Sequence, residues 1–325
     1  MSSDNKGSEL KPNTINFTDE LDKKGAFIRV QSSFRNFISS SPDAEFKPEA
    51  NRYHVYISYA CPWASSVYHT IQFKGLQDVI DVSIVDYLLE AGGWHFSERE
   101  GSTVDKINGF KFLRQVYELS DKNFNGRVTV PVLFDTKTKK IVNNESSEII
   151  RMLNSEFNHL AKHPEVDLNP TELHTQIQEM YDFIYPNINN GVYRCGFAIS
   201  QEAYSDAFEK LFSALDKVED ILSKQRYLVG SKLTYVDIRL FVTLIRFDCV
   251  YVGHFKCNKK QIKEYSNISN FVREIYQMEG TKKTVNFFHI KHHYYESHRT
   301  INPYGIVPVG PNMDWVNEPH NRSNL

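Results

Sequence analysis

The sequence has little of what marks secreted, membrane-spanning or nucleic-acid-binding proteins. Its 325 residues include four cysteines and no C-x-x-C pair, which argues against a disulfide framework and a dithiol redox motif. No run approaches the roughly 18 apolar residues of a membrane-spanning helix. A net charge of −2 gives no electrostatic reason to expect nucleic acid or an anionic membrane as a partner. Residues 1–24 carry neither an apolar leader core nor an arginine-rich amphipathic pattern, so we expect a cytoplasmic protein.

Metal ligands are also scarce. The clustered candidates are His289, His292, His293 and His298, and a basic or packed helix end explains them better than a metal does, so we expect no metal. Aromatic residues are abundant, with 18 Tyr and 22 Phe, which suits a pocket for flat ligands although packing alone would also use them. The chain is long enough for two domains.

The first half of the chain has the element order of a thioredoxin-like domain. Alternating apolar residues over 53–59 predict a strand that stops at Cys61-Pro62, and proline suits the first helical position. Cys61 therefore lies where a strand turns into a helix. The further elements expected are a strand over 79–85, a long polar insertion over 86–126, strands over 128–134 and 141–142, and a helix over 145–157.

The second half is expected to be helical. The periodic segments are 171–187, 203–224, 234–250 and 261–277. Thr234 and Asp237 form a capping box at the start of the third segment. The fold class is therefore α/β plus all-α. We expect an N-terminal extension over 1–45, a thioredoxin-like domain over 46–160, an all-helical domain over 171–280 and an irregular tail over 281–325 that is rich in His, Tyr, Asn and Pro.

Cys61 is the candidate nucleophile. A helix N-terminus offers unpaired amide donors and a positive dipole end, which lower a thiol pKa. Ala64 fills the partner position of a dithiol motif, so no resolving cysteine lies beside Cys61. We expect a monothiol cycle in which Cys61 attacks a sulfur and an external thiol resolves the mixed disulfide. The alternative is a small buried cysteine that only closes the corner between strand and helix.

Two downstream features favour a peptide-binding site. Pro131 interrupts a strand, and in thioredoxin-like domains such a proline is cis and exposes the backbone of the preceding residue, here Val130. Glu145 and Ser146 begin the next helix, whose N-terminus suits a carboxylate, and Glu145 is placed to pair with an ammonium group. The alternatives are an edge-strand proline and a capping serine. Thiol, carboxylate and amine are the three groups of glutathione.

Eight stretches between about residue 25 and residue 311 carry a family resemblance. They are FKPEANRYHVYISYACPWA, GGWHF, GRVTVPVLFD, NNESSEIIRM, NNGVYRCGFA, RFDCVYVGHFKCN, TVNFFHIKHHYYESH and INPYGIVPVGP. The sequence resembles the glutathionyl-hydroquinone reductases, also called Xi-class glutathione transferases. The resemblance implies a thioredoxin-like domain followed by an all-helical glutathione-transferase domain, glutathione as co-substrate, and a homodimer.

The resemblance also implies a reaction and its residues. Cys61 attacks the sulfur of an S-glutathionyl-hydroquinone, Tyr193 protonates the leaving carbon, and a second glutathione releases oxidised glutathione from Cys61. Tyr251 and Tyr294 match further active-site tyrosines, and spacing favours Tyr294 over the adjacent Tyr295. The residues that match the glutathione-binding set are Trp94, Arg127, Val128, Thr129, Val130, Glu145 and Ser146.

Two departures and two alternatives accompany this reading. Family members usually have His-Arg after CPWA, whereas this chain has Ser65 and Ser66, which predicts that Cys61 is a weaker nucleophile. The second departure is Tyr304, at a position where members often have Thr. One alternative is an omega-like thiol transferase or dehydroascorbate reductase that uses the same cysteine. The other is a non-catalytic interaction module of the same fold. The tyrosines favour hydroquinone release, because disulfide exchange needs no acid for a carbon leaving group.

Overall fold

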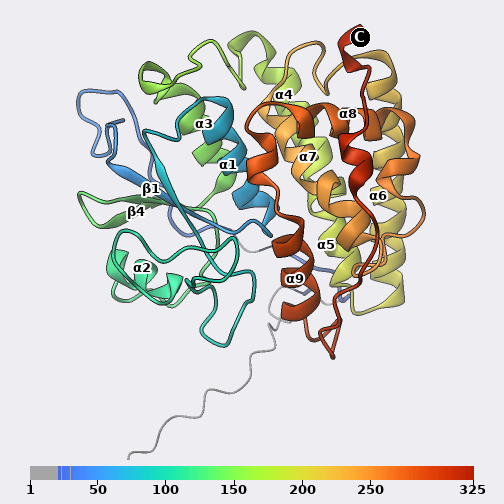
Figure 1. Ribbon diagram of the computed structural model, residues 1–325, viewed down its shortest axis with the longest axis horizontal. Coiled ribbons are helices and arrows are strands. Elements are labelled where there is room, and N and C mark those ends of the chain that lie inside the picture. The colour runs from blue at the N-terminus through green and yellow to red at the C-terminus, as the bar shows by residue number, and fades with distance from the viewer. Residues whose placement is uncertain (1–20, 23, 30) are drawn as a thin grey trace, which may run out of the picture.

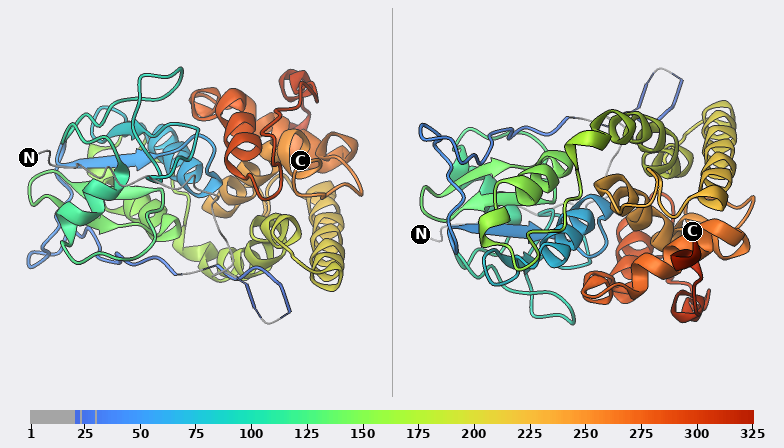
Figure 2. Two further views of the ribbon diagram at one scale, coloured as in Figure 1. Left: turned by 90° about the horizontal axis from the view of Figure 1, so that it is seen from below. Right: turned by 90° about the horizontal axis from the view of Figure 1, so that it is seen from above.

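The computed structural model describes residues 21, 22, 24–29 and 31–325. Residues 1–20, 23 and 30 of the expected N-terminal extension over 1–45 lie outside the described residues. The sheet and its helices occupy one side of the molecule and a bundle of helices the other (Figure 1). Both views of Figure 2 place α6 (Gln201–Lys224) at the end opposite the sheet. The predicted fold class is confirmed, whereas the domain bounds stay predictions.

The four-stranded sheet has the order β2-β1-β3-β4. The buried strand β1 (Tyr53–Ile57) runs parallel to β2 (Asp81–Ile84) and antiparallel to β3 (Val132–Asp135), which pairs with β4 (Lys140–Asn143). The strand predicted from residue 128 starts only at Val132. Pro131 has no N–H to give to a ladder, and the Val130–Pro131 peptide is cis, as expected for this layout.

Two helices, α1 (Pro62–Phe73) and α3 (Ser146–Ser155), pack against each other beside the sheet. A third helix, α2 (Leu113–Ser120), lies within the insertion, for which the sequence predicted only loop. That prediction is wrong in this stretch, since Leu113, Val116 and Tyr117 bury one face of α2. Two turns are too short for a clear helical period, and Phe112 at the N-cap gives no start signal.

The helical bundle agrees with the predicted segments, with shifted ends. It contains α4 (His174–Ile184), α5 (Gly191–Gly196), α6, α7 (Tyr235–Arg246) and α8 (Ser266–Gln277). The segment predicted from residue 261 begins with a 3-10 turn, and α8 starts at Ser266. Every residue of α7 is buried, and its predicted capping box of Thr234 with Asp237 is present. No helix in the described part of the chain is long and apolar enough to cross a membrane.

The tail contains a helix that the sequence analysis missed. Residues 281–325 were expected to be irregular, but α9 (Phe287–Ser297) forms there and lies between the sheet side and the bundle (Figure 1). Its buried positions include polar residues, so the pattern lacks an apolar face. His289 bonds the carbonyl oxygen of Glu100 at 2.6 Å, and His293 bonds that of Tyr87 at 2.7 Å. Contacts to the insertion therefore stabilise α9.

The described part of the N-terminal segment packs onto both sides of the molecule. Arg35 forms a bridge with Asn143 of β4, while the N–H of Ile199 donates to the carbonyl of Gly25 at 3.2 Å. Phe27 is buried against the rings of Tyr193 and Phe197. This segment therefore forms part of the wall between the sheet side and the bundle.

Candidate active site

A cavity of about 830 Å³ lies where the sheet side, the helical bundle and the N-terminal segment meet. All but one of the predicted site residues line it. They are Cys61, Trp94, Arg127, Val128, Thr129, Val130, Glu145, Ser146, Tyr193 and Tyr294. The exception is Tyr251, which is fully buried behind Tyr294 and forms no part of the lining. The fold thus gathers residues that are far apart in sequence into one hollow.

Cys61 occupies the N-cap position of α1, with Pro62 in the first helical turn. Its Sγ lies 3.5 Å from the carbonyl oxygen of Val130, the residue before the cis proline. Burial raises the pKa of the Cys61 thiol. The N–H groups of Ala64 and Trp63 and the charges of Arg246 and Arg29 act in the opposite direction without outweighing burial.

The expectation of a lowered Cys61 pKa is therefore wrong, since burial outweighs the helix N-terminus. The two serines one turn into α1 are buried. The Ser65 carbonyl accepts from His69 at 2.7 Å, and the Ser66 hydroxyl donates to the Trp63 carbonyl at 2.7 Å. Positive charge reaches the thiol from Arg246 and Arg29, outside this helix.

Three tyrosine hydroxyls form a hydrogen-bonded chain at the helical side of the site. The Oη atoms of Tyr193 and Tyr294 are 2.5 Å apart, and those of Tyr251 and Tyr294 are 3.1 Å apart. Burial raises the pKa of all three phenols, most strongly for Tyr251 and Tyr294. Each hydroxyl therefore keeps its proton near neutral pH, as a general acid requires.

Tyr294 and Tyr295 lie in different surroundings. Tyr294 lines the cavity, whereas the Tyr295 ring packs edge-on against His254, with centroids 4.8 Å apart, outside the lining. Successive residues of a helix point about 100° apart, so only one of the two can face the site.

The opposite end of the cavity offers polar groups for a peptide. Glu145 accepts from the N–H of Ser147 at 3.2 Å and from the Ser32 hydroxyl at 3.0 Å. The Ser146 hydroxyl accepts from Arg239 at 2.6 Å. Trp94 stacks on the ring of His293 at 5.0 Å, which fixes one wall. An acid, a helix N-terminus and an arginine thus lie together, and such a set suits an amine and a carboxylate.

Sequence reasoning missed several lining residues. The position of Arg239 could have been noticed in the sequence. It stands in a largely apolar helix, and a charged residue buried there needs a polar partner. Arg29 had none, since the segment that carries it showed no period, and His298 was considered only as a candidate metal ligand. Trp63, in the first turn of α1, also lines the cavity.

The histidines of α9 and His298, which follows the helix, do not converge on one point. His292 pairs with Glu296 on the same helix at 2.9 Å, and His298 bonds His254 at 3.1 Å. Among residues 21, 22, 24–29 and 31–325 no group of three or more metal-ligating side chains comes together.

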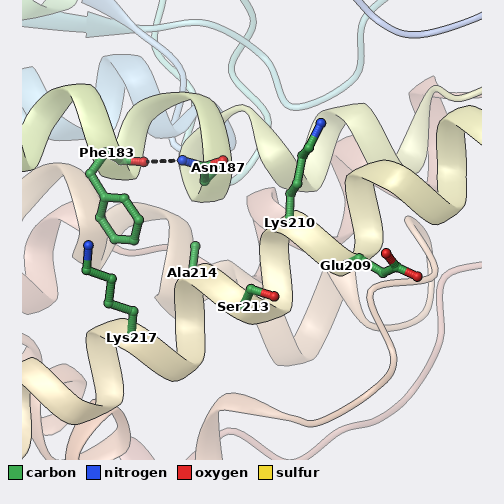
Figure 3. A pocket seen from close by; sticks show the side chains of 7 residues that line it. All are labelled: Phe183, Asn187, Glu209, Lys210, Ser213, Ala214 and Lys217. Carbon is green, nitrogen blue, oxygen red and sulfur yellow. Dashed lines mark hydrogen bonds between the residues drawn. The ribbon is translucent and has the colours of Figure 1, made fainter.

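A second hollow, of about 440 Å³, lies between α4 with its following turn and α6 (Figure 3). Asn187 donates to the carbonyl of Phe183 at 2.8 Å, and Lys217 lies over the Phe183 ring at 4.3 Å. The residues that line it include neither a cysteine nor a tyrosine. The cavity at Cys61 is therefore the candidate active site.

Comparisons with known proteins cover both sides of the molecule. Residues 60–156 match the family model for the glutathione S-transferase N-terminal domain, and residues 201–274 match that for the C-terminal domain. Over 305 residues the chain is 48% identical to glutathionyl-hydroquinone reductase YqjG of Escherichia coli, with 92% of each chain covered.

Solved structures agree with these matches. The chain superposes on a Xi-class GST of Natrialba magadii with a TM-score of 0.88 and 47% identity, covering 90% of this chain and 89% of that one. The glutathione-bound structure of YqjG gives a TM-score of 0.87 at 48% identity, covering 90% and 97%.

Proposed function

This chain belongs to the glutathione S-transferase family, within its Xi class, and from that membership we propose that it reduces S-glutathionyl-hydroquinones to hydroquinones. Glutathione is the co-substrate, and no metal takes part. The observation that supports the proposal most is a thiol in one cavity with two protonated, hydrogen-bonded tyrosines, Tyr193 and Tyr294. The proposal includes a homodimer in the cytoplasm.

The first half of the cycle breaks a carbon–sulfur bond. Tyr193 gives its proton to the ring carbon that bears the sulfur, and the proton of a ring hydroxyl returns to Tyr193, so the ring becomes a dienone. The deprotonated Cys61 then attacks the sulfur. A Cys61–glutathione disulfide forms, the C–S electron pair enters the ring, and the hydroquinone leaves as a phenolate that takes a proton from water.

The second half restores the enzyme. The thiolate of a second glutathione attacks the glutathione sulfur of the mixed disulfide, and Cys61 leaves as the thiolate. Oxidised glutathione is released. Each turnover thus consumes one conjugate and one glutathione, and the two electrons that reduce the ring carbon come from the two glutathione sulfurs, which are oxidised to a disulfide.

The glutathione half of the substrate is assigned to the polar end of the cavity. Val130 offers its backbone beside Cys61, while Ser146 with Arg239 suits a carboxylate and Glu145 suits the ammonium group. The other residues assigned to glutathione are Trp94, Arg127, Val128 and Thr129.

Replacing the nucleophile tests this function. We expect Cys61→Ser to lower hydroquinone release from a glutathionyl-hydroquinone plus glutathione by at least about 10³-fold, because a serine hydroxyl is a poor nucleophile at sulfur. Cys249→Ser is the matched control, since Cys249 is buried and does not line the cavity.

The same assay separates the alternatives. Undiminished release by the Cys61→Ser protein would contradict the mechanism. If the unmodified protein releases no hydroquinone but reduces a glutathione mixed disulfide, it is an omega-like thiol transferase or dehydroascorbate reductase. Silence in both assays, with a stable complex recovered from cell extract, would identify a non-catalytic module.

A further inference from the structure

Arg29 places a cation at the aromatic end of the cavity. Its guanidinium carbon lies 4.9 Å from the centroid of the Trp63 ring, 5.0 Å from that of Tyr193 and 5.4 Å from that of Phe27. Its Nε donates to Oδ1 of Asn190 at 2.8 Å. Three rings and one hydrogen bond thus hold a side chain that also lines the cavity.

Among the residues that the structure describes, no acid pairs with Arg29. No ion pair joins it to a carboxylate in the part of the chain that the structure describes, whereas Arg35 of the same cavity pairs with Glu148. Its terminal nitrogens make no hydrogen bond within those residues. Arg29 also lowers the pKa of Cys61 and Tyr193 against the effect of burial, so its charge reaches both reacting groups.

The proposed reaction creates a negative charge near this position. When the C–S bond breaks, its electron pair moves through the ring to an oxygen, and the hydroquinone leaves as a phenolate. A fixed guanidinium with free N–H groups stabilises such an anion, since it is positioned before the charge develops. A neutral side chain there would remove a cavity arginine that, among the described residues, is free of a carboxylate or hydroxyl partner, whereas Arg239, on the same Trp63 ring, already bonds Ser146.

We propose that Arg29 is a catalytic residue that binds the phenolate oxygen of the departing hydroquinone. This role rests on the proposed function. It adds a third function to those of the nucleophile and the acid, because Arg29 binds the oxygen of the leaving group. Arg29 then reduces the dependence of the rate on ring acidity, so that weakly acidic hydroquinones also leave readily.

A series of conjugates with graded ring acidity tests this role. We expect Arg29→Gln to lower kcat by about 10²-fold for the least acidic hydroquinones and by under about 10-fold for the most acidic. The plot of log kcat against phenol pKa should therefore become steeper. Arg29→Lys should restore much of the loss, because the charge remains.

Two controls separate leaving-group binding from other effects. The Arg29→Gln protein should lose no more than about 10-fold in the rate at which it reduces the mixed disulfide of glutathione and 2-mercaptoethanol, since no phenolate leaves and only the effect of Arg29 on the thiol pKa is lost; this activity also reports an intact fold and thiol. Arg35→Gln removes a cavity arginine that already has a partner, Glu148, and should leave the slope unchanged.

The outcomes have distinct meanings. An unchanged slope in Arg29→Gln, or an equal loss on the disulfide substrate, would overturn the role while the proposed function stands. An unmodified enzyme that releases no hydroquinone from any conjugate would overturn the proposed function and this role together.

Discussion

The three hydrogen-bonded tyrosines differ in their access to the cavity. Tyr193 and Tyr294 line the cavity, while Tyr251 touches it only through its 3.1 Å hydrogen bond to Tyr294. The hydrogen bond from Tyr294 lowers the pKa of Tyr193, although burial keeps that pKa raised overall. Tyr193 is therefore the member of the chain best placed to give up a proton to a ring.

Phenylalanine substitutions should rank the tyrosines. We expect Tyr193→Phe to lower kcat for hydroquinone release by roughly 10²- to 10⁴-fold, as loss of a general acid does. Tyr251→Phe should cost about 10-fold, the effect of one lost hydrogen bond to Tyr294.

The helix itself supplies the control for these variants. Tyr295→Phe, next to Tyr294 but outside the lining, should stay within about 2-fold in steady-state kinetics. An equal loss in Tyr251→Phe and Tyr193→Phe would mean that Tyr193 is not the donor.

The helix α7 connects the bundle to the chemistry. Arg239 bonds Ser146 at the start of α3, and Arg246 donates to the carbonyls of Ala60 at 3.0 Å and Tyr59 at 2.7 Å, just before Cys61. The position of α7 therefore sets both ends of the site. Its own start depends on the buried Asp237, which accepts from the N–H groups of Thr234 and Leu228, each at 2.8 Å.

Removing this cap should loosen the helix. We expect Asp237→Ala to lower the free energy of unfolding by about 2 to 4 kcal/mol, because one cap is lost and buried donors are left unpaired. Urea unfolding measures this change. Asp220→Ala, which removes only an exposed pair with Lys224, should cost under about 0.5 kcal/mol. Equal effects of the two substitutions would contradict the structural role of the cap.

Buried neutral histidines affect the stability of the whole molecule. Burial lowers their pKa below the ordinary value of 6.5, to about 3 for His69 and about 4 for His54, His254 and His293. Between pH 6.5 and pH 4 these histidines are therefore protonated in the unfolded chain and stay neutral in the folded chain. Asp237 and Asp248, whose pKa burial raises to about 6, act in the opposite direction but are fewer.

Stability should consequently fall in mild acid. The free energy of unfolding that the histidines supply is fully present above pH 6.5 and is lost as pH falls, by about 1.4 kcal/mol per pH unit for each net proton taken up. Urea unfolding at a series of pH values measures the slope.

Substitution of one buried and one exposed histidine tests whether burial causes this pH dependence. His254→Asn should flatten the slope by about one proton, whereas the same change at the exposed His163 should leave it unaltered. A stability that stays level between pH 6.5 and pH 4 would contradict the prediction.

Local signals in the sequence were sufficient for some features. Cys61-Pro62, Pro131 and the box of Thr234 with Asp237 each act within a few residues, and the structure has the strand–helix corner, the cis peptide and the cap where they were expected. The thiol pKa was predicted in the wrong direction, because burial depends on the packing of distant segments.

Long-range contacts explain what was missed. The helix α9 has buried histidines in place of an apolar stripe, and their partners are Tyr87 and Glu100, some 200 residues earlier. Arg29 acquires its position from Asn190 and from the ring of Tyr193. No pattern within either segment carries that information.

The distance along the chain between thiol and acid has a consequence for synthesis. Cys61 and its proline corner are translated long before α9, which brings Tyr294 to the cavity. Domains near the N-terminus fold while the rest is still being made. A growing chain thus contains the sulfur nucleophile before Tyr193 and well before Tyr294, and its hydrogen-bonded chain of tyrosines is complete only when α9 docks.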